Sequence, residues 1–187
     1  QLIASEPNMD EDTRKEFSAI IQKNTEELMQ LVNDVLDLSR LEANMMKFQI
    51  QEYDAVALCN DAIYMARMRN EETIEIYFDT HIETQPITTD TGRLIQALVS
   101  TLTYPQKNTT HREITFTLTR DDSGKQICFR ISNSPLADPE FNSQEVSIRH
   151  DINRLLLQHF GGSYNITADE QERPVINFTY PLDIISE

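Results

Sequence analysis

A long amphipathic segment near the start of the chain constrains its fold more than any other feature. Between Glu11 and about Met46, apolar residues recur at alternating spacings of three and four, and charged residues fill the other faces. The recurring positions are Phe17, Ile21, Asn24, Leu28, Leu31, Val35, Leu38 and Met45. Further apolar residues widen this seam, namely Ile20, Val32, Leu36 and Leu41. The width favours a bundle of several helices over a two-stranded coiled coil.

The seam is compatible with two packings. As an interface, it predicts a homodimer formed by four-helix packing. The interface residues would be Leu28, Leu31, Val35 and Leu38. The alternative is a single long helix that lies on its own domain, because about four turns of such a pattern are a short run. Asn24 would fix the register if the seam is an interface.

Helix and strand patterns alternate along the rest of the chain. Helices are predicted after the capping residues Asp54 and Asp90, and from about Arg149 to Phe160. Strands are predicted at 73–79, 86–90, 112–120, 125–132, 163–167 and 174–182. The turn 121–124, Asp-Asp-Ser-Gly, joins two of them as a hairpin. This order predicts an α+β sandwich, in which one mixed sheet carries its helices on one face behind a helical stalk.

The charge balance argues against several kinds of partner. Sixteen basic and 31 acidic residues give a formal charge of −15, which repels nucleic acid and anionic lipid at long range. The chain contains no apolar run of membrane-spanning length and no secretion-signal pattern at its start. We therefore expect no nucleic-acid partner, no membrane contact by this segment and a cytoplasmic location. Because the chain opens on Gln1 and not on Met, we expect it to be part of a longer protein with a membrane anchor upstream.

Cysteine and histidine spacings do not suggest a metal site. Cys59 and Cys128 lie in apolar segments without a Cys-x-x-Cys pair, which predicts buried free thiols in a reducing compartment. The four histidines are scattered without ligand spacing: His81, His111, His150 and His159. The sequence therefore predicts neither a bound metal nor a catalytic histidine.

Four separated segments, in the right order, resemble the core of sensor histidine kinases. Residues 31–44, LVNDVLDLSRLEAN, resemble the end of the second helix in the dimerisation and phosphotransfer domain. Asp90 and residues 93–98, RLIQAL, are similar to the start of the helix that carries the asparagine motif of the ATPase domain. Residues 156–162, LLQHFGG, and 176–182, INFTYPL, resemble a later helix end and the closing strand.

This resemblance implies a division of the chain into two parts. Residues 1–50 would form a partial dimerisation and phosphotransfer domain that lacks most of its first helix. Residues 51–187 would form an ATPase domain, a mixed-sheet sandwich of the histidine kinase and Hsp90-like type. The family's phosphoacceptor histidine lies in a His-Glu-x-Arg-Thr-Pro motif, which does not occur in residues 1–187.

The residues that would bind nucleotide in that family are largely replaced. The asparagine that ligates Mg²⁺ aligns with Tyr104, and a phenol is a poor ligand for that ion. The family's Asp-Thr-Gly-x-Gly aligns with residues 133–137, Asn-Ser-Pro-Leu-Ala. Its second glycine motif cradles phosphates with backbone amides and aligns with residues 147–152, SIRHDI. No glycine lies between Asn133 and Asp151, so a loop that depends on positive φ angles is not expected there.

Three residues retain groups that suit a degenerate ATP site. They are Asn133 with its amide oxygen, Lys107 at the position of the family's lysine, and Arg149 near the phosphate motif. Because three motifs are eroded, the resemblance implies a pseudokinase or regulatory interaction module of two-component signalling, with no catalytic residue and no bound cofactor. Its expected partners are a second copy of itself and a response regulator or kinase.

Two alternatives remain open from the sequence. A divergent active kinase would use ATP and Mg²⁺ to phosphorylate a stalk histidine and then a response regulator. A phosphotransfer protein would use the stalk histidine without ATP. Both require the first stalk helix.

Overall fold

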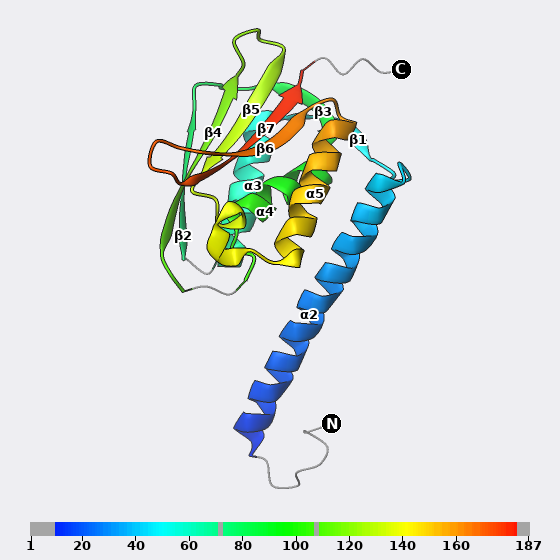
Figure 1. The fold of residues 1–187 in the computed structure, drawn as a ribbon, viewed down its shortest axis with the longest axis vertical. Coiled ribbons are helices and arrows are strands. Elements are labelled where there is room, and N and C mark those ends of the chain that lie inside the picture. The colour runs from blue at the N-terminus through cyan, green and yellow to red at the C-terminus, as the bar shows by residue number, and fades with distance from the viewer. Residues whose placement is uncertain (1–9, 71–72, 107–108, 183–187) are drawn as a thin grey trace.

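The computed structural model describes residues 10–70, 73–106 and 109–182. Its first element is the long helix α2, Glu11–Glu42, which extends away from a folded domain (Figure 1). Asp10 caps the start of α2 by accepting a hydrogen bond from the backbone N–H of Asp12 at 2.6 Å. Among the described residues, no helix combines the length and the apolar character needed to cross a membrane.

The predicted long helix is confirmed, but it ends before Met46. Asn44 adopts a left-handed φ of 54°, and the N–H of Met45 donates to the carbonyl of Arg40 at 2.8 Å. The N–H of Asn44 also donates to the carbonyl of Leu41 at 3.1 Å. These bonds form a Schellman motif, which satisfies the last helical carbonyls and reverses the chain. Met45 therefore lies outside the helix, contrary to the sequence pattern.

A mixed sheet of five strands forms the centre of the domain in the order β2-β4-β5-β7-β6. The strands are β2 (Ile74–Thr80), β4 (Arg112–Arg120), β5 (Gln126–Ser132), β6 (Ser163–Ala168) and β7 (Pro174–Pro181). β2 and β4 are parallel, and the other neighbours are antiparallel. A separate antiparallel pair joins β1 (Ile50–Asp54) to β3 (Pro86–Asp90). The predicted α+β sandwich with a mixed sheet is confirmed.

Three helices of this domain cover one face of the five-stranded sheet (Figure 1). They are α3 (Ala55–Asn70), α4 (Thr91–Leu102) and α5 (Gln144–His159). Both predicted caps are confirmed: the N–H of Ala57 donates to the Asp54 carboxylate at 3.1 Å, and the N–H of Arg93 donates to Asp90 at 3.1 Å. Each carboxylate satisfies an N–H that has no carbonyl partner within its helix.

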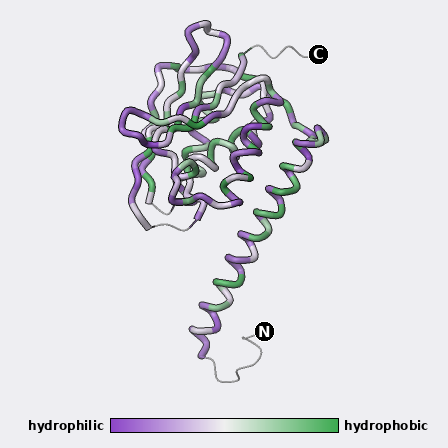
Figure 2. Tube along the Cα trace, viewed as in Figure 1, coloured by the Kyte–Doolittle hydropathy of each residue, from purple (hydrophilic) through white to green (hydrophobic). Residues whose placement is uncertain are grey.

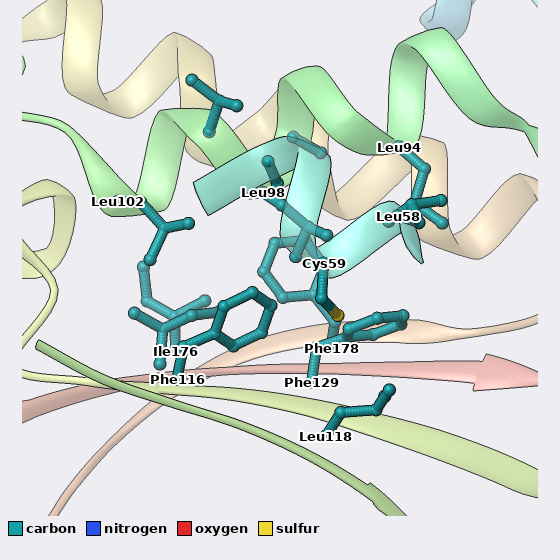
Figure 3. Packing of buried hydrophobic residues seen from close by; sticks show 14 of the residues in the cluster. Leu58, Cys59, Leu94, Leu98, Leu102, Phe116, Leu118, Phe129, Ile176 and Phe178 are labelled. Carbon is teal, nitrogen blue, oxygen red and sulfur yellow. The ribbon is translucent and has the colours of Figure 1, made fainter. Parts of the chain in front are cut away.

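The hydrophobic core lies between these helices and the sheet (Figure 3). Leu58 and Cys59 of α3 and leucines of α4 face aromatic rings from the strands. Among the described residues, the fully buried rings are Phe116, Phe129, Phe178 and Tyr180. Cys59 is a free, buried thiol as predicted, whereas Cys128 is free but only half-buried. Burial raises the pKa of the Cys59 thiol, which keeps it protonated and inert.

Candidate functional site

The segment 133–142 after β5, where the resemblance places a glycine motif, forms a compact loop. It contains two short 3₁₀ helices, Pro135–Ala137 and Pro139–Phe141, each with proline at its start. Proline fixes φ near the helical value and needs no N–H acceptor at that position. Asp138 caps the second turn by accepting a hydrogen bond from the N–H of Glu140 at 2.9 Å. Asn133 has a φ of 63° and supplies the left-handed turn at which the chain leaves the strand.

This loop is packed into the domain and contributes to its core. The Leu136 side chain is fully buried within the main hydrophobic cluster. The hydroxyl of Ser134, also fully buried, donates to the carbonyl of Thr101 on α4 at 2.6 Å. Thr101 lies in the helix that carries the aligned asparagine motif. Protein atoms of the loop are therefore in direct contact with α4 at its C-terminal end.

Arg112 at the start of β4 binds the first residue and the middle of the loop. Its guanidinium donates to the backbone oxygen of Asn133 at 3.1 Å and to the side-chain oxygen of Asn133 at 3.2 Å, and it pairs with Asp138. It also lies over the ring of Tyr104, 5.7 Å from the ring centre. Burial alone would raise the pKa of Asp138, but the hydrogen bonds from Arg112 and from the N–H of Glu140 outweigh it and lower that pKa.

His150 connects the same loop to α5 and the sheet. Its Nε2 lies 3.2 Å from the carbonyl oxygen of Leu136, and its Nδ1 lies 2.6 Å from the hydroxyl of Tyr164. Because a carbonyl only accepts, this geometry fits the neutral tautomer in which Nε2 donates and Nδ1 accepts from the tyrosine. Burial lowers the pKa of His150 and outweighs the hydrogen bond to Leu136, which acts in the opposite direction.

The structure shows the surroundings of two of the three residues proposed for a degenerate ATP site. The amide oxygen of Asn133 accepts from Arg112, and its amide nitrogen donates to the carbonyl of Glu113 at 2.9 Å. Arg149 donates to Glu145 at 2.8 Å and faces α2. The groups singled out for nucleotide contacts are thus engaged with protein partners. Lys107, the third residue, lies outside the described residues.

Tyr104, at the position of the family's metal ligand, lies beyond the end of α4. Its hydroxyl donates to the carbonyl of Thr110 at 2.6 Å, and its ring packs edge-on against Phe141 with centres 5.5 Å apart. Tyr104 therefore joins the loop structure through its ring.

A second polar arrangement lies where α2 meets the domain. Arg149 of α5 pairs with Asp34 at 3.7 Å, and Arg93 of α4 pairs with Asp37 at 3.3 Å. Asp34 and Asp37 lie one helical turn apart on α2 and face the domain together. Two cavities of about 140 Å³ and 470 Å³ border these ion pairs. The sequence patterns did not identify this contact, because its partners are distant along the chain.

The surface also brings together three possible metal ligands that sequence spacing did not reveal. Glu75 and Glu113 are opposite each other on the parallel strands β2 and β4, and His111 lies beside them. Their ligand atoms all lie within 4.8 Å of one another, but all three residues are exposed. His111 also lies 3.9 Å from Glu75, and Tyr77 donates to Glu75 at 2.6 Å. Such an exposed acidic cluster is compatible with a metal-free surface.

Comparison with known proteins supports the resemblance seen in the sequence. No family model matches the chain. The hybrid signal transduction histidine kinase A of Dictyostelium discoideum is 26% identical over 119 residues, which are 63% of this chain and 6% of that protein. The chain therefore spans a small part of this curated relative.

Solved histidine kinases share the fold. The Acinetobacter baumannii histidine kinase AdeS has a TM-score of 0.68 at 14% identity, covering 97% of this chain and 90% of that one. The histidine kinase ThkA, solved in complex with the response regulator protein TrrA, has a TM-score of 0.69 at 16% identity, covering 96% and 54%. The long helix, the mixed sheet and its one-sided helical layer thus follow a known architecture. The chain is similar in sequence to histidine kinases and shares the fold of solved histidine kinases, a long helix followed by an α+β domain.

Proposed function

We propose that this chain is a degenerate histidine kinase core that takes part in two-component signalling through protein contacts, without nucleotide chemistry. In this reading, residues 1–50 are part of the dimerising stalk and residues 51–187 are an ATPase-like domain. The signal would pass between stalk and domain as a change in their contact, and the kinase fold would serve as a scaffold.

The packed loop 133–142 is the observation that carries this proposal. In histidine kinases, the Asp-Thr-Gly-x-Gly motif that aligns with residues 133–137 uses glycines so that the backbone can approach the adenine base. Here the corresponding segment has two prolines, buries Leu136 completely, and uses the Ser134 hydroxyl to hold α4. Opening it for a nucleotide would expose Leu136 and leave the Ser134 hydroxyl and Thr101 carbonyl to find other partners.

The exposed apolar side chains of α2 support a second copy as one partner. Leu28 is 60% exposed and Val35 46% exposed, whereas Leu31 and Leu38 are half-buried. Figure 2 shows apolar residues recurring along the whole visible length of this helix. Because a single helix cannot bury two apolar sides on one small domain, the exposed side fits helical packing against another chain.

A response regulator is the second proposed partner. The neighbour ThkA was solved in complex with the response regulator protein TrrA, and this chain shares the fold of that kinase over nearly its whole length. We infer that a degenerate core with this shape still presents a surface for a regulator.

Calorimetric titration with a non-hydrolysable ATP analogue, with and without Mg²⁺, tests the proposal. The expected result is no saturable heat at millimolar ligand, in protein whose circular dichroism and cooperative melting show that it is folded. Saturable micromolar binding would overturn it and favour the divergent active kinase. Asn133→Ala, which removes one proposed adenine contact, would then show whether binding uses the family's site.

A further inference from the structure

The cavity between α2, α4 and α5 has the size of a small-molecule site. Its volume of about 140 Å³ is close to the roughly 150 Å³ that holds a benzene ring in an engineered cavity. Part of its lining is apolar, with Leu41 from α2 and Ile152 and Leu156 from α5. In Figure 1 the upper half of α2 runs beside α5, which places this cavity between the stalk and the domain.

The charges around the cavity are unusual for this protein. Three arginines and only two aspartates line it, in a chain whose formal charge is −15. The arginines are Arg69, Arg93 and Arg149, and the aspartates are Asp34 and Asp37. Within the part of the chain that the structure describes, Arg69 forms no ion pair with an acidic side chain. Arg149 also pairs with Glu145 at 2.8 Å and Arg93 with Asp90 at 3.9 Å, so Arg69 is the arginine of the lining whose charge favours an anionic occupant.

One of the two ion pairs between α2 and the domain is loose, whereas in the other the Arg93 guanidinium donates a hydrogen bond to Asp37. The Nε of Arg149 lies 3.7 Å from the Asp34 carboxylate, which is beyond hydrogen-bond distance. Arg93 lies 3.3 Å from Asp37. The wall beside them is ordered, because the side chain of Asn153, only 2% exposed, donates to the hydroxyl of Ser100 at 3.2 Å. A better-placed anion can therefore replace the aspartates without rebuilding the wall.

We propose that this cavity binds a small amphipathic anion, a carboxylate or phosphate group on an apolar body of about the size of a benzene ring. The cavity's arginines take the charged group, and Leu41, Ile152 and Leu156 contact the apolar body. The bound anion competes with Asp34 and Asp37 for Arg149 and Arg93, so it loosens the attachment of α2 to the domain. This site is separate from the loop 133–142 and does not depend on the proposed loss of nucleotide binding.

Amide NMR titration of the full 187-residue chain tests the site. The probes are benzoate and phenyl phosphate, with benzyl alcohol as the neutral analogue and inorganic phosphate as the bare anion. Saturation by benzoate or phenyl phosphate in the millimolar range, about −4 kcal/mol, with shifts in α2, α4 and α5, is expected. Whichever of benzoate and phenyl phosphate binds with the higher affinity identifies the preferred head group as a carboxylate or a phosphate. Shifts confined to 133–142 would instead mark the nucleotide region and overturn this site.

Charge variants separate ligand binding from the docking of the stalk. Arg69→Gln removes an arginine that does not pair with α2, and it should weaken binding about threefold or more. Asp34→Asn removes a competing carboxylate and should strengthen binding by a similar factor. The matched control Arg154→Gln, on α5 but outside the cavity lining, should leave affinity unchanged.

Three outcomes would overturn the proposal. They are the lack of saturation at tens of millimolar, equal binding of benzyl alcohol, and an affinity that Arg69→Gln leaves unchanged. Asp34→Asn could detach α2 from the domain and so remove the cavity. In that case, the affinities of Arg69→Gln and Arg154→Gln for the probes still decide whether the site exists.

Discussion

Truncation of Leu136 gives the sharpest test of whether the loop 133–142 is part of the core. The side chain is fully buried, so Leu136→Ala removes buried methyl and methylene groups and leaves a cavity. Leucine-to-alanine changes in cores cost about 2 to 5 kcal/mol, and we expect about 3 kcal/mol here. For a chain of this size, that loss lowers the melting temperature by about 6 to 12 °C.

Chemical denaturation followed by circular dichroism measures this loss, because the midpoint and slope give the free energy of unfolding. The matched control is Met68→Ala on α3, whose side chain is 69% exposed; its cost should stay within about 0.5 kcal/mol. A loop that opened freely for a ligand would contribute little to global stability. A cost for Leu136→Ala as small as that of the control would refute the packed-loop argument.

Three further changes have defined outcomes. Leu28→Asp with Val35→Asp, at two exposed positions of α2, should convert a dimer to a monomer by light scattering; an unchanged dimer mass would place the interface elsewhere. Burial lowers the folded pKa of His150 below 6.5, so the unfolded chain binds more protons just below that pH and stability falls on acidification. His150→Gln should flatten the dependence of the unfolding midpoint on pH below about 6.5, and equal slopes there would contradict this. Gly162→Ala places a Cβ 2.0 Å from a β7 carbonyl oxygen, whereas at Gly92 the nearest atom is 3.7 Å away; calorimetry should show a lower melting temperature only for Gly162→Ala, and equal values would refute the clash.

Much of the fold was predictable because its signals are local. The caps Asp54 and Asp90 lie immediately before their helices, and the hairpin turn lies between two alternating patterns. Strand β1 was missed because it is short, mostly exposed and paired with β3, a partner distant in sequence. Helix α5 begins five residues earlier than expected, at Gln144, since Ser143 caps a mostly polar first turn in which Val146 is the one apolar residue.

Only part of the candidate site could be predicted from the sequence. The absence of glycines between Asn133 and Asp151 predicted that no glycine-dependent phosphate loop forms there, but it did not predict which contacts this segment makes. The bond from Ser134 to α4 and the pairing of Arg112 with Asp138 join residues 26 or more positions apart, so no local pattern reveals them. The sequence also offered Arg149 only as a nucleotide contact, whereas its side chain pairs with Asp34 on the stalk.

The packing of the loop 133–142 and the contact of α2 with the domain together suggest how a kinase-like core can remain folded without a nucleotide. The two prolines restrict the backbone of the loop before any tertiary contact forms, which reduces the entropy lost on packing Leu136. The contact of α2 with the domain, in contrast, rests partly on two ion pairs that are partly exposed, one of them loose, and such pairs contribute about 1 kcal/mol or less each. We therefore expect the loop 133–142 to belong to the stable core, and a partner or a small anion to act on the position of the long helix α2.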